Sequence, residues 1–102
     1  MKVAISSSGE GINAEFEPRF GRCKNFVIYD TENKTFKTIP NPALEEESGA
    51  GIKAAKEIIK RDVKMLITGR IGLNALKVLS SSGVRIVKGS YSTVKEAIEK
   101  EV

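Results

Sequence analysis

Short runs of apolar and β-branched residues alternate with longer amphipathic stretches along this chain. Runs of this kind, bounded by glycine, proline or small polar residues, are typical of strands. Strands are predicted at residues 2–6, 26–30, 35–39, 63–68 and 84–87. The third run alternates Phe36 with polar neighbours, which predicts a half-exposed strand, and Pro40 stops it because proline cannot donate to the ladder.

Three stretches repeat their apolar residues at helical spacing. Residues 49–61 place isoleucines and alanines on one side and lysines on the other, and residues 71–81 repeat leucine in the same way until Gly83 ends the pattern. Thr93 and Glu96 form a capping box, in which each side chain serves a main-chain amide at a helix start. The third helix is therefore predicted over residues 93–100.

Connection lengths predict the strand directions. Parallel neighbours need a crossover of about 10 to 12 residues or more, whereas a hairpin needs only a tight turn. Residues 9–24 contain Pro18 and Gly21 and lack a helical period, so the second strand is predicted to run antiparallel to the first. The tight turn after it and the two helical crossovers make the other strands parallel to the first. The chain is thus predicted to be an α/β protein with a five-stranded mixed sheet.

Composition agrees with one globular domain over residues 1–102, since 40% of the residues are hydrophobic and 29% are charged. The net charge of +4 is spread along the chain, which favours a small anionic partner over nucleic acid. No apolar run approaches about 18 residues and the N-terminus lacks a signal-peptide core. We therefore expect no membrane partner, and a cytoplasmic monomer.

The residue inventory excludes several kinds of catalysis. One cysteine and no histidine cannot make a disulfide, a Cys/His zinc site or a Ser-His-Asp triad within the chain. A nuclease would need carboxylates on the strands to hold magnesium, but the first strand has none and Asp30 ends a strand at the opposite edge. An enzyme is therefore not expected, although a nuclease or a nucleotide-binding protein stays an alternative.

Strand directions bring four glycine-bearing polar stretches to one edge of the predicted sheet, namely residues 6–9, 19–22, 49–51 and 69–72. Main-chain amides and guanidinium groups both favour negative charge, so this edge is the candidate site for an anion. Glycines at a helix start can expose amides to a ligand, or can serve only to make a turn. The candidate binding residues are Ser8, Arg19, Arg22, Cys23, Gly49, Ala50, Gly51, Gly69, Arg70 and Asn74.

Cys23 is the only side chain among these that could ligate a soft metal. A cysteine beside an arginine can be a reactive thiolate, but a free cysteine can equally be a small buried hydrophobe. A second motif, Gly9-x-Gly11-x-x-Ala14, matches the dinucleotide fingerprint in form. That fingerprint needs a helix at this point, and residues 13–18 have neither the length nor the period for one, so a polar loop is predicted.

The residues laid out so far resemble those of the dinitrogenase iron-molybdenum cofactor biosynthesis family over nearly the whole chain. The resemblance is carried by six segments: Arg19-Phe20-Gly21-Arg22-Cys23 leading to Phe26, Asn41-Pro42, Gly49-Ala50-Gly51-Ile52, Ile67 to Ala75, Gly83-Val84, and Thr93 to Ala97. It implies a three-layer ribonuclease H-like fold with helices on both faces of the sheet.

The resemblance also implies a function. Such proteins are carriers of an iron-sulfur or iron-molybdenum cluster, or of its precursors, and their partners are cofactor-assembly proteins. Cofactor-carrying members often have a histidine before the Phe-Gly pair, where this chain has Arg19. A guanidinium supplies charge and hydrogen bonds in place of metal ligation. A protein-interaction or regulatory module that binds a small anion is the alternative function.

Overall fold

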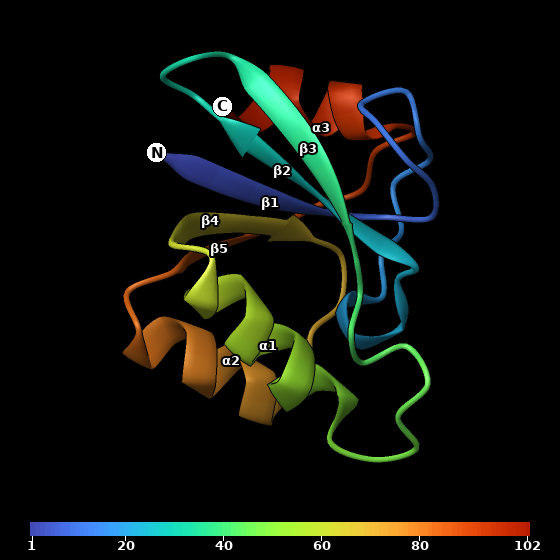
Figure 1. Ribbon diagram of the computed structural model, residues 1–102, viewed down its shortest axis with the longest axis vertical. Helices are drawn as coiled ribbons and strands as arrows, with labels where there is room; N and C mark the ends of the chain where they lie inside the picture. Colours follow the sequence, from blue (N-terminus) through green and yellow to red (C-terminus); the bar gives the residue numbers. More distant parts are fainter.

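The computed structural model describes residues 1–102 and contains one five-stranded sheet between two layers of helix (Figure 1). Each predicted strand and helix is present, with ends within two residues of the prediction. The strands are β1 (Lys2–Ser7), β2 (Asn25–Asp30), β3 (Thr35–Pro40), β4 (Val63–Thr68) and β5 (Arg85–Lys88), and the helices are α1 (Ala50–Lys60), α2 (Leu73–Ser81) and α3 (Val94–Glu101), with a 3₁₀ turn η1 (Phe20–Arg22).

The strand order is β3-β2-β1-β4-β5, and β2 is the strand that runs against the others. The β1–β2 and β2–β3 pairs are antiparallel, whereas β1–β4 and β4–β5 are parallel, which confirms the predicted mixed sheet. The ends of β1 and β4 and the start of β2 consequently lie together. We call this the carboxyl edge; it lies on the right in Figure 1.

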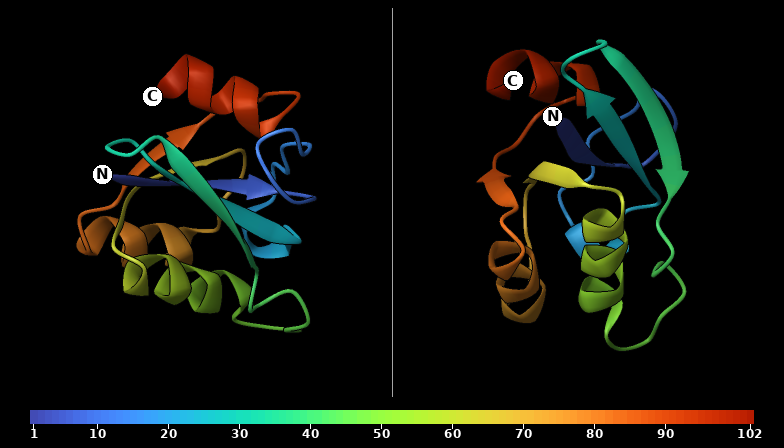
Figure 2. Two further views of the ribbon diagram at one scale, coloured as in Figure 1. Left: turned by 45° about the horizontal axis from the view of Figure 1, so that its top comes forward. Right: turned by 60° about the vertical axis from the view of Figure 1, so that its left-hand side comes forward.

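Helices cover both faces of the sheet, as predicted. α1 and α2 lie on one face and α3 on the other (Figure 2). Successive residues of β1 point to opposite faces: Ala4 packs in the cluster of α1 and α2, while Val3 and Ile5 pack with Val94 of α3. These two clusters form the core. The ribonuclease H-like label itself stays a prediction.

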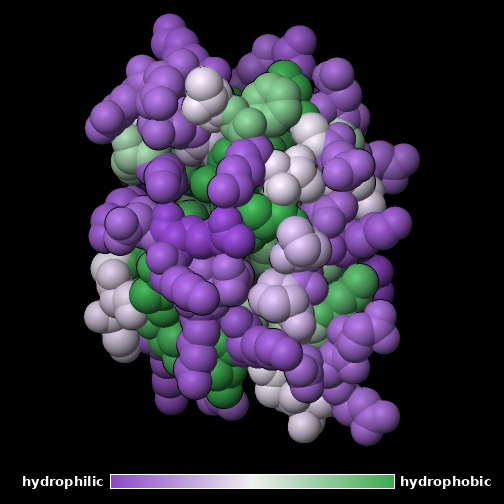
Figure 3. Space-filling view, in the orientation of Figure 1, coloured by the Kyte–Doolittle hydropathy of each residue, from purple (hydrophilic) through white to green (hydrophobic).

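The surface is mostly hydrophilic when it is viewed as in Figure 1, with hydrophobic residues showing in patches between polar ones (Figure 3). The large exposed hydrophobic residues include Phe36 on the edge strand and Leu73 at the start of α2. Leu73 is 62% exposed, the highest value among them. None of the helices has the length and apolar character needed to cross a membrane.

The segment between β1 and η1 forms an irregular loop, and no helix occupies residues 11–19, which confirms the interpretation of the glycine motif. We call residues 8–19 the bridging loop, because its main chain bonds both to the start of α3 and to the carboxyl edge. At the start of α3 the bonds are Phe16 N to Ser92 O (3.2 Å), Val94 N to Ala14 O (3.0 Å) and Lys95 N to Ile12 O (2.8 Å). At the carboxyl edge they are Glu17 N to Ser6 O (3.0 Å) and Gly69 N to Pro18 O (3.0 Å).

Candidate anion-binding site

The first turns of α1 and α2 lie side by side below the carboxyl edge and form the two walls of one hollow. A Cβ placed on Gly51 would lie 3.2 Å from Ala75 Cβ, so the absence of a side chain there lets the helices approach closely. The hollow measures about 270 Å³ and is lined by Gly49, Ala50, Gly51, Ile52, Gly72, Leu73, Asn74 and Ala75. No ionisable side chain belongs to this lining.

Neither helix start is capped by a side chain. The residues in the cap positions are Gly49 and Gly72, which have no side chain to offer. The first amide bonds of the two helices are Lys53 N to Gly49 O and Leu76 N to Gly72 O, both 3.0 Å. The six amides of residues 50–52 and 73–75 come before them and have no hydrogen-bond partner in the chain. Two positive helix ends with unpaired donors therefore meet at one hollow, an arrangement that favours an anion.

Arg70 stands where β4 passes into α2, two residues before the second cap. Its main chain is fixed by hydrogen bonds from Arg70 N to Pro18 O and from Phe20 N to Arg70 O, at 2.6 and 3.0 Å. Its side chain is exposed, and its guanidinium makes no hydrogen bond or ion pair with the chain. Arg70 thus keeps a full positive charge available to a ligand.

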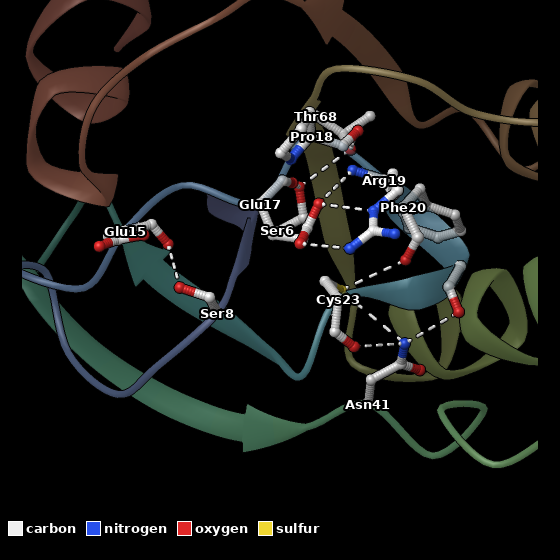
Figure 4. A network of polar contacts seen from close by, with 11 residues as sticks. Ser6, Ser8, Glu15, Glu17, Pro18, Arg19, Phe20, Cys23, Asn41 and Thr68 are labelled. Carbon is white, nitrogen blue, oxygen red and sulfur yellow. Dashed lines mark hydrogen bonds and ion pairs between the residues drawn. The ribbon is translucent and has the colours of Figure 1, made fainter.

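Arg19 pairs with Arg70 through an isolated parallel bridge of the main chain, so two of the predicted arginines are neighbours. The guanidinium of Arg19, however, is bound to Glu17. Nε donates to Oε2 at 3.2 Å and Nη2 to Oε1 at 3.1 Å, and the Arg19 amide donates to Oε2 at 2.9 Å (Figure 4). The hydrogen bond from the Arg19 side chain lowers the pKa of Glu17, so the carboxylate stays charged and neutralises Arg19.

Arg22 is hydrogen-bonded to the loop between β3 and α1. Its Nη1 donates to the main-chain oxygen of Glu46 at 2.8 Å. The carboxylate of the same glutamate pairs with Lys53 of α1 at 2.6 Å. Arg22 therefore anchors residues 41–49 beside the first turn of α1, and its donors are partly used by the chain itself.

The position of Cys23 favours the second of the two interpretations left open by the sequence, a small buried hydrophobe rather than a metal ligand. The side chain is 0% exposed, its Sγ donates to Phe20 O at 3.3 Å, and Asn41 Nδ2 lies 3.8 Å from the sulfur (Figure 4). Burial raises the pKa of the thiol to about 12, which keeps it protonated at neutral pH. No group of three or more His, Cys, Asp or Glu residues in the chain could hold a metal ion. Cys23 is a small buried core residue.

Two further predicted residues have structural roles. Ser8 is exposed on the bridging loop, where its hydroxyl donates to Glu15 O at 3.2 Å, and it lies away from Arg19 (Figure 4). Gly69 packs against Pro18 so closely that a Cβ there would lie 2.6 Å from Pro18 Cβ. Gly49, Ala50, Gly51 and Asn74 are thus the predicted residues that meet at the hollow, with Arg70 beside it.

The list of candidate binding residues omitted Gly72, Leu73 and Glu17, although the sequence already placed residues 69–72 at this edge of the sheet. A glycine directly before an amphipathic helix, where a serine or aspartate is common, was a visible signal for an uncapped helix start at Gly72. Nothing in the sequence indicated that Glu17 would turn toward Arg19.

Two other hollows lie at the opposite edge of the sheet and share Lys2 and Asp30. Their linings carry both signs of charge, so these charges partly cancel. The hollow between α1 and α2 is distinguished from them by its unpaired main-chain donors and its lack of carboxylates.

Comparison with known proteins places this architecture in context. The sequence profile of a family described as dinitrogenase iron-molybdenum cofactor matches residues 1–101. An uncharacterized protein from Methanocaldococcus jannaschii is 30% identical in an alignment of 102 positions. The alignment covers 97% of this chain and 83% of the relative.

Solved structures show the same fold. The apo form of the orange protein from Desulfovibrio gigas superposes with a TM-score of 0.92 at 29% identity, covering 97% of this chain and 84% of that one. A Thermotoga protein, proposed to be a NifB protein and placed in the DUF35 family, gives a TM-score of 0.85 at 33% identity over 96% of this chain and 84% of its own. From its first strand to its last helix, the chain belongs to the dinitrogenase iron-molybdenum cofactor family.

Proposed function

We propose that this protein is a non-enzymatic carrier of an anionic metal cluster or cofactor precursor, which binds in the hollow between the first turns of α1 and α2. One observation carries the proposal: residues 50–52 and 73–75 line one hollow, and their six main-chain amides have no partner in the chain. Such donors favour negative charge wherever two helix starts converge.

The chemistry of the hollow suits a cluster bound without metal–protein bonds. Exposed sulfides of a cluster accept hydrogen bonds, and Arg70, two residues before the cap of α2, adds one unpaired positive charge. A hydrogen bond to a charged group contributes about 1.5 to 3 kcal/mol, so several together retain a ligand. Without a coordinate bond to break, the cluster can pass to an assembly protein, which is the partner that a carrier requires.

The lining supports a carrier over an enzyme. It consists of glycine, alanine, isoleucine, leucine and asparagine, none of which can act as a general acid, a general base or a nucleophile at neutral pH. The family points in the same direction, because its description names the iron-molybdenum cofactor. The description of the orange protein as an apo form also agrees with a fold that holds a removable group.

Gly72 offers a direct test. Its φ of −68° suits any residue, and a Cβ there would meet no atom within 4 Å. Gly72→Asp should cap α2 with its own carboxylate and occupy the donors that the ligand needs. Gly72→Asn makes the same cap without the charge, and Gly72→Ala makes no cap.

The probe is tetrathiomolybdate, a coloured molybdenum–sulfide dianion, titrated without oxygen and followed by absorbance and by amide chemical shifts. We expect binding to the parent and to Gly72→Ala, weaker binding to Gly72→Asn, and the weakest binding to Gly72→Asp. The amide signals of residues 50–52 and 73–75 should move first. Equal affinity for all four proteins, or shifts confined to the opposite edge, would refute the site, and preferential binding of a nucleotide would refute the cargo.

A further inference from the structure

Glu17 is an anion that the protein itself supplies at the carboxyl edge. Its side chain is only 15% exposed, whereas that of its partner Arg19 is 56% exposed. The carboxylate receives three hydrogen bonds from Arg19, which leaves this arginine without net charge toward a ligand. A ligand at this edge therefore competes with the Glu17 carboxylate for the positive charge of Arg19.

The main chain of Glu17 is held firmly in place. Glu17 N donates to Ser6 O at 3.0 Å, and the Ser6 hydroxyl donates back to Glu17 O. The Ser6 hydroxyl is also 2.9 Å from that of Thr68 at the end of β4 (Figure 4). Because the ends of both β1 and β4 fix this segment, the main chain that carries the Glu17 carboxylate is held in place.

The segment that carries the Glu17–Arg19 pair lies next to the starts of both helices, although neither residue lines the hollow itself. The main chain of Arg19 pairs with that of Arg70, two residues before the cap of α2. Two residues after Arg19, a Cβ on Gly21 would lie 3.4 Å from the amide nitrogen of Gly51 in the first turn of α1. Glu17 also acts electrostatically on Arg70, whose charge helps to lower the pKa of the carboxyl.

We propose that Glu17 is the specificity-determining residue of this site: by neutralising Arg19 it disfavours compact oxyanions such as phosphate and leaves the site to a large, diffuse cluster anion. This inference rests on the proposed function. Six free amides with two free arginines would make a general phosphate site, since helix starts and guanidinium groups are what phosphate binds. Phosphate is abundant in cells, so a carrier needs a feature that acts against it.

The discrimination follows from charge density. A compact dianion must approach the Glu17 carboxylate with its charge concentrated on a few oxygens, and it gains nothing from Arg19 while the pair is closed. A sulfide anion, from tetrathiomolybdate to a larger cluster, spreads its charge over bulky sulfur atoms, so repulsion from one fixed carboxylate costs it less, while hydrogen bonds to the amides remain.

The test measures dissociation constants for inorganic phosphate and for tetrathiomolybdate at low salt. The proteins are the parent, Glu17→Gln, Arg19→Gln and the double variant. Glutamine retains an oxygen that can accept from the Arg19 amide, so the fold of the loop is retained. Glu15→Gln is the control, because it removes an exposed carboxylate from the same loop without freeing an arginine.

Glu17→Gln should bind phosphate about tenfold more tightly and tetrathiomolybdate less than about threefold more tightly, because one freed guanidinium adds a charge-assisted hydrogen bond. Arg19→Gln should weaken phosphate binding, since it leaves the carboxylate unpaired. The double variant should return to within about threefold of the parent. Glu15→Gln should change neither affinity by more than about twofold.

An equal gain from Glu17→Gln and Glu15→Gln would overturn the inference, because net charge alone would then explain it. An unchanged phosphate affinity in Glu17→Gln, or an Arg19→Gln variant that binds phosphate as the parent does, would also overturn it. Failure of the proposed function would give a different result. Tetrathiomolybdate would then not bind the parent, or would bind Gly72→Asp as well as the parent, while the phosphate affinities would still decide the role of Glu17.

Discussion

Gly69 and Pro18 lie in such close contact that a Cβ built on the glycine would be 2.6 Å from Pro18 Cβ and 2.9 Å from Pro18 Cα. The carbonyl of the same proline accepts from Gly69 N at 3.0 Å and from Arg70 N at 2.6 Å. This contact holds the bridging loop against the end of β4, and it fixes the main chain of Arg70 two residues before the cap of α2.

Gly69→Ala should therefore destabilise the protein by about 1 to 3 kcal/mol, because the added methyl group must displace main-chain atoms that cannot turn away. Urea denaturation followed by circular dichroism measures the change. Gly72→Ala is the matched control: it has open space for the methyl group, and a less flexible unfolded chain should make it neutral or up to about 1 kcal/mol more stable. Equal effects at the two positions would contradict this account.

Cys23 should resist alkylation. Burial raises the pKa of its thiol from an ordinary 9.0 to about 12, so little thiolate forms at pH 8 and reagents cannot reach the sulfur. Iodoacetamide labelling, followed by mass spectrometry, should be slow in the native protein and fast in urea. Because the folded pKa is raised, the thiol contributes stability that is complete below pH 9 and is lost as the pH rises toward 12. Native labelling at the unfolded rate would show that the thiol is accessible.

Glu17 should stabilise the protein near neutral pH and lose this effect in acid. Its pKa is lowered in the folded state by the hydrogen bond from Arg19, so its contribution is present above the ordinary value of 4.5 and is lost as the pH falls through the lowered pKa. The parent should be more stable than Glu17→Gln at pH 6, and the difference should shrink toward zero under strongly acidic conditions. Urea midpoints of both proteins across this pH range give the comparison. A constant difference would mean that the carboxylate charge is not what stabilises the loop.

Arg70 should matter to the ligand but little to the fold. Arg70→Gln keeps the two main-chain hydrogen bonds and removes the free guanidinium, so tetrathiomolybdate should bind roughly tenfold more weakly and with less dependence on salt. Thermal stability should change by less than about 0.5 kcal/mol, as at other exposed positions. Arg85→Gln, at the exposed first residue of β5, removes an equal charge away from the hollow and should leave binding nearly unchanged.

The backbone was predictable because each element carried a periodic signal. The mostly apolar run of Val63–Thr68 appears as β4 with the predicted bounds, and the spacing of the leucines gave α2 to within two residues. The antiparallel direction of β2 followed from the absence of a helical period in the loop before it. Periodicity reports which way a helix or strand faces, and the lengths of the connections then set the strand directions.

The side chains of the candidate site were harder to predict, because they lie on loops that have no period. Arg19, Arg22 and Arg70 look alike in the sequence, yet one is neutralised by a glutamate, one holds a loop carbonyl and one is free. Cys23 and Arg22 are adjacent, but the first is fully buried and the second is exposed. Such differences depend on which way a short 3₁₀ turn points, and tertiary contacts decide that.

The bridging loop also sets the order in which the protein can be completed during synthesis. Its carbonyls at Ile12 and Ala14 accept from Lys95 and Val94, so this part of the loop finds these partners only after the start of α3 has been synthesised. Contacts that span so much of a chain form late, because the entropy of closing the intervening loop opposes them. The two walls of the hollow, the first turns of α1 and α2, need none of these contacts. A nascent chain that stops before α3 can therefore hold β1 to β5 and the hollow, while the part of the bridging loop around Ile12 and Ala14 still lacks its partners.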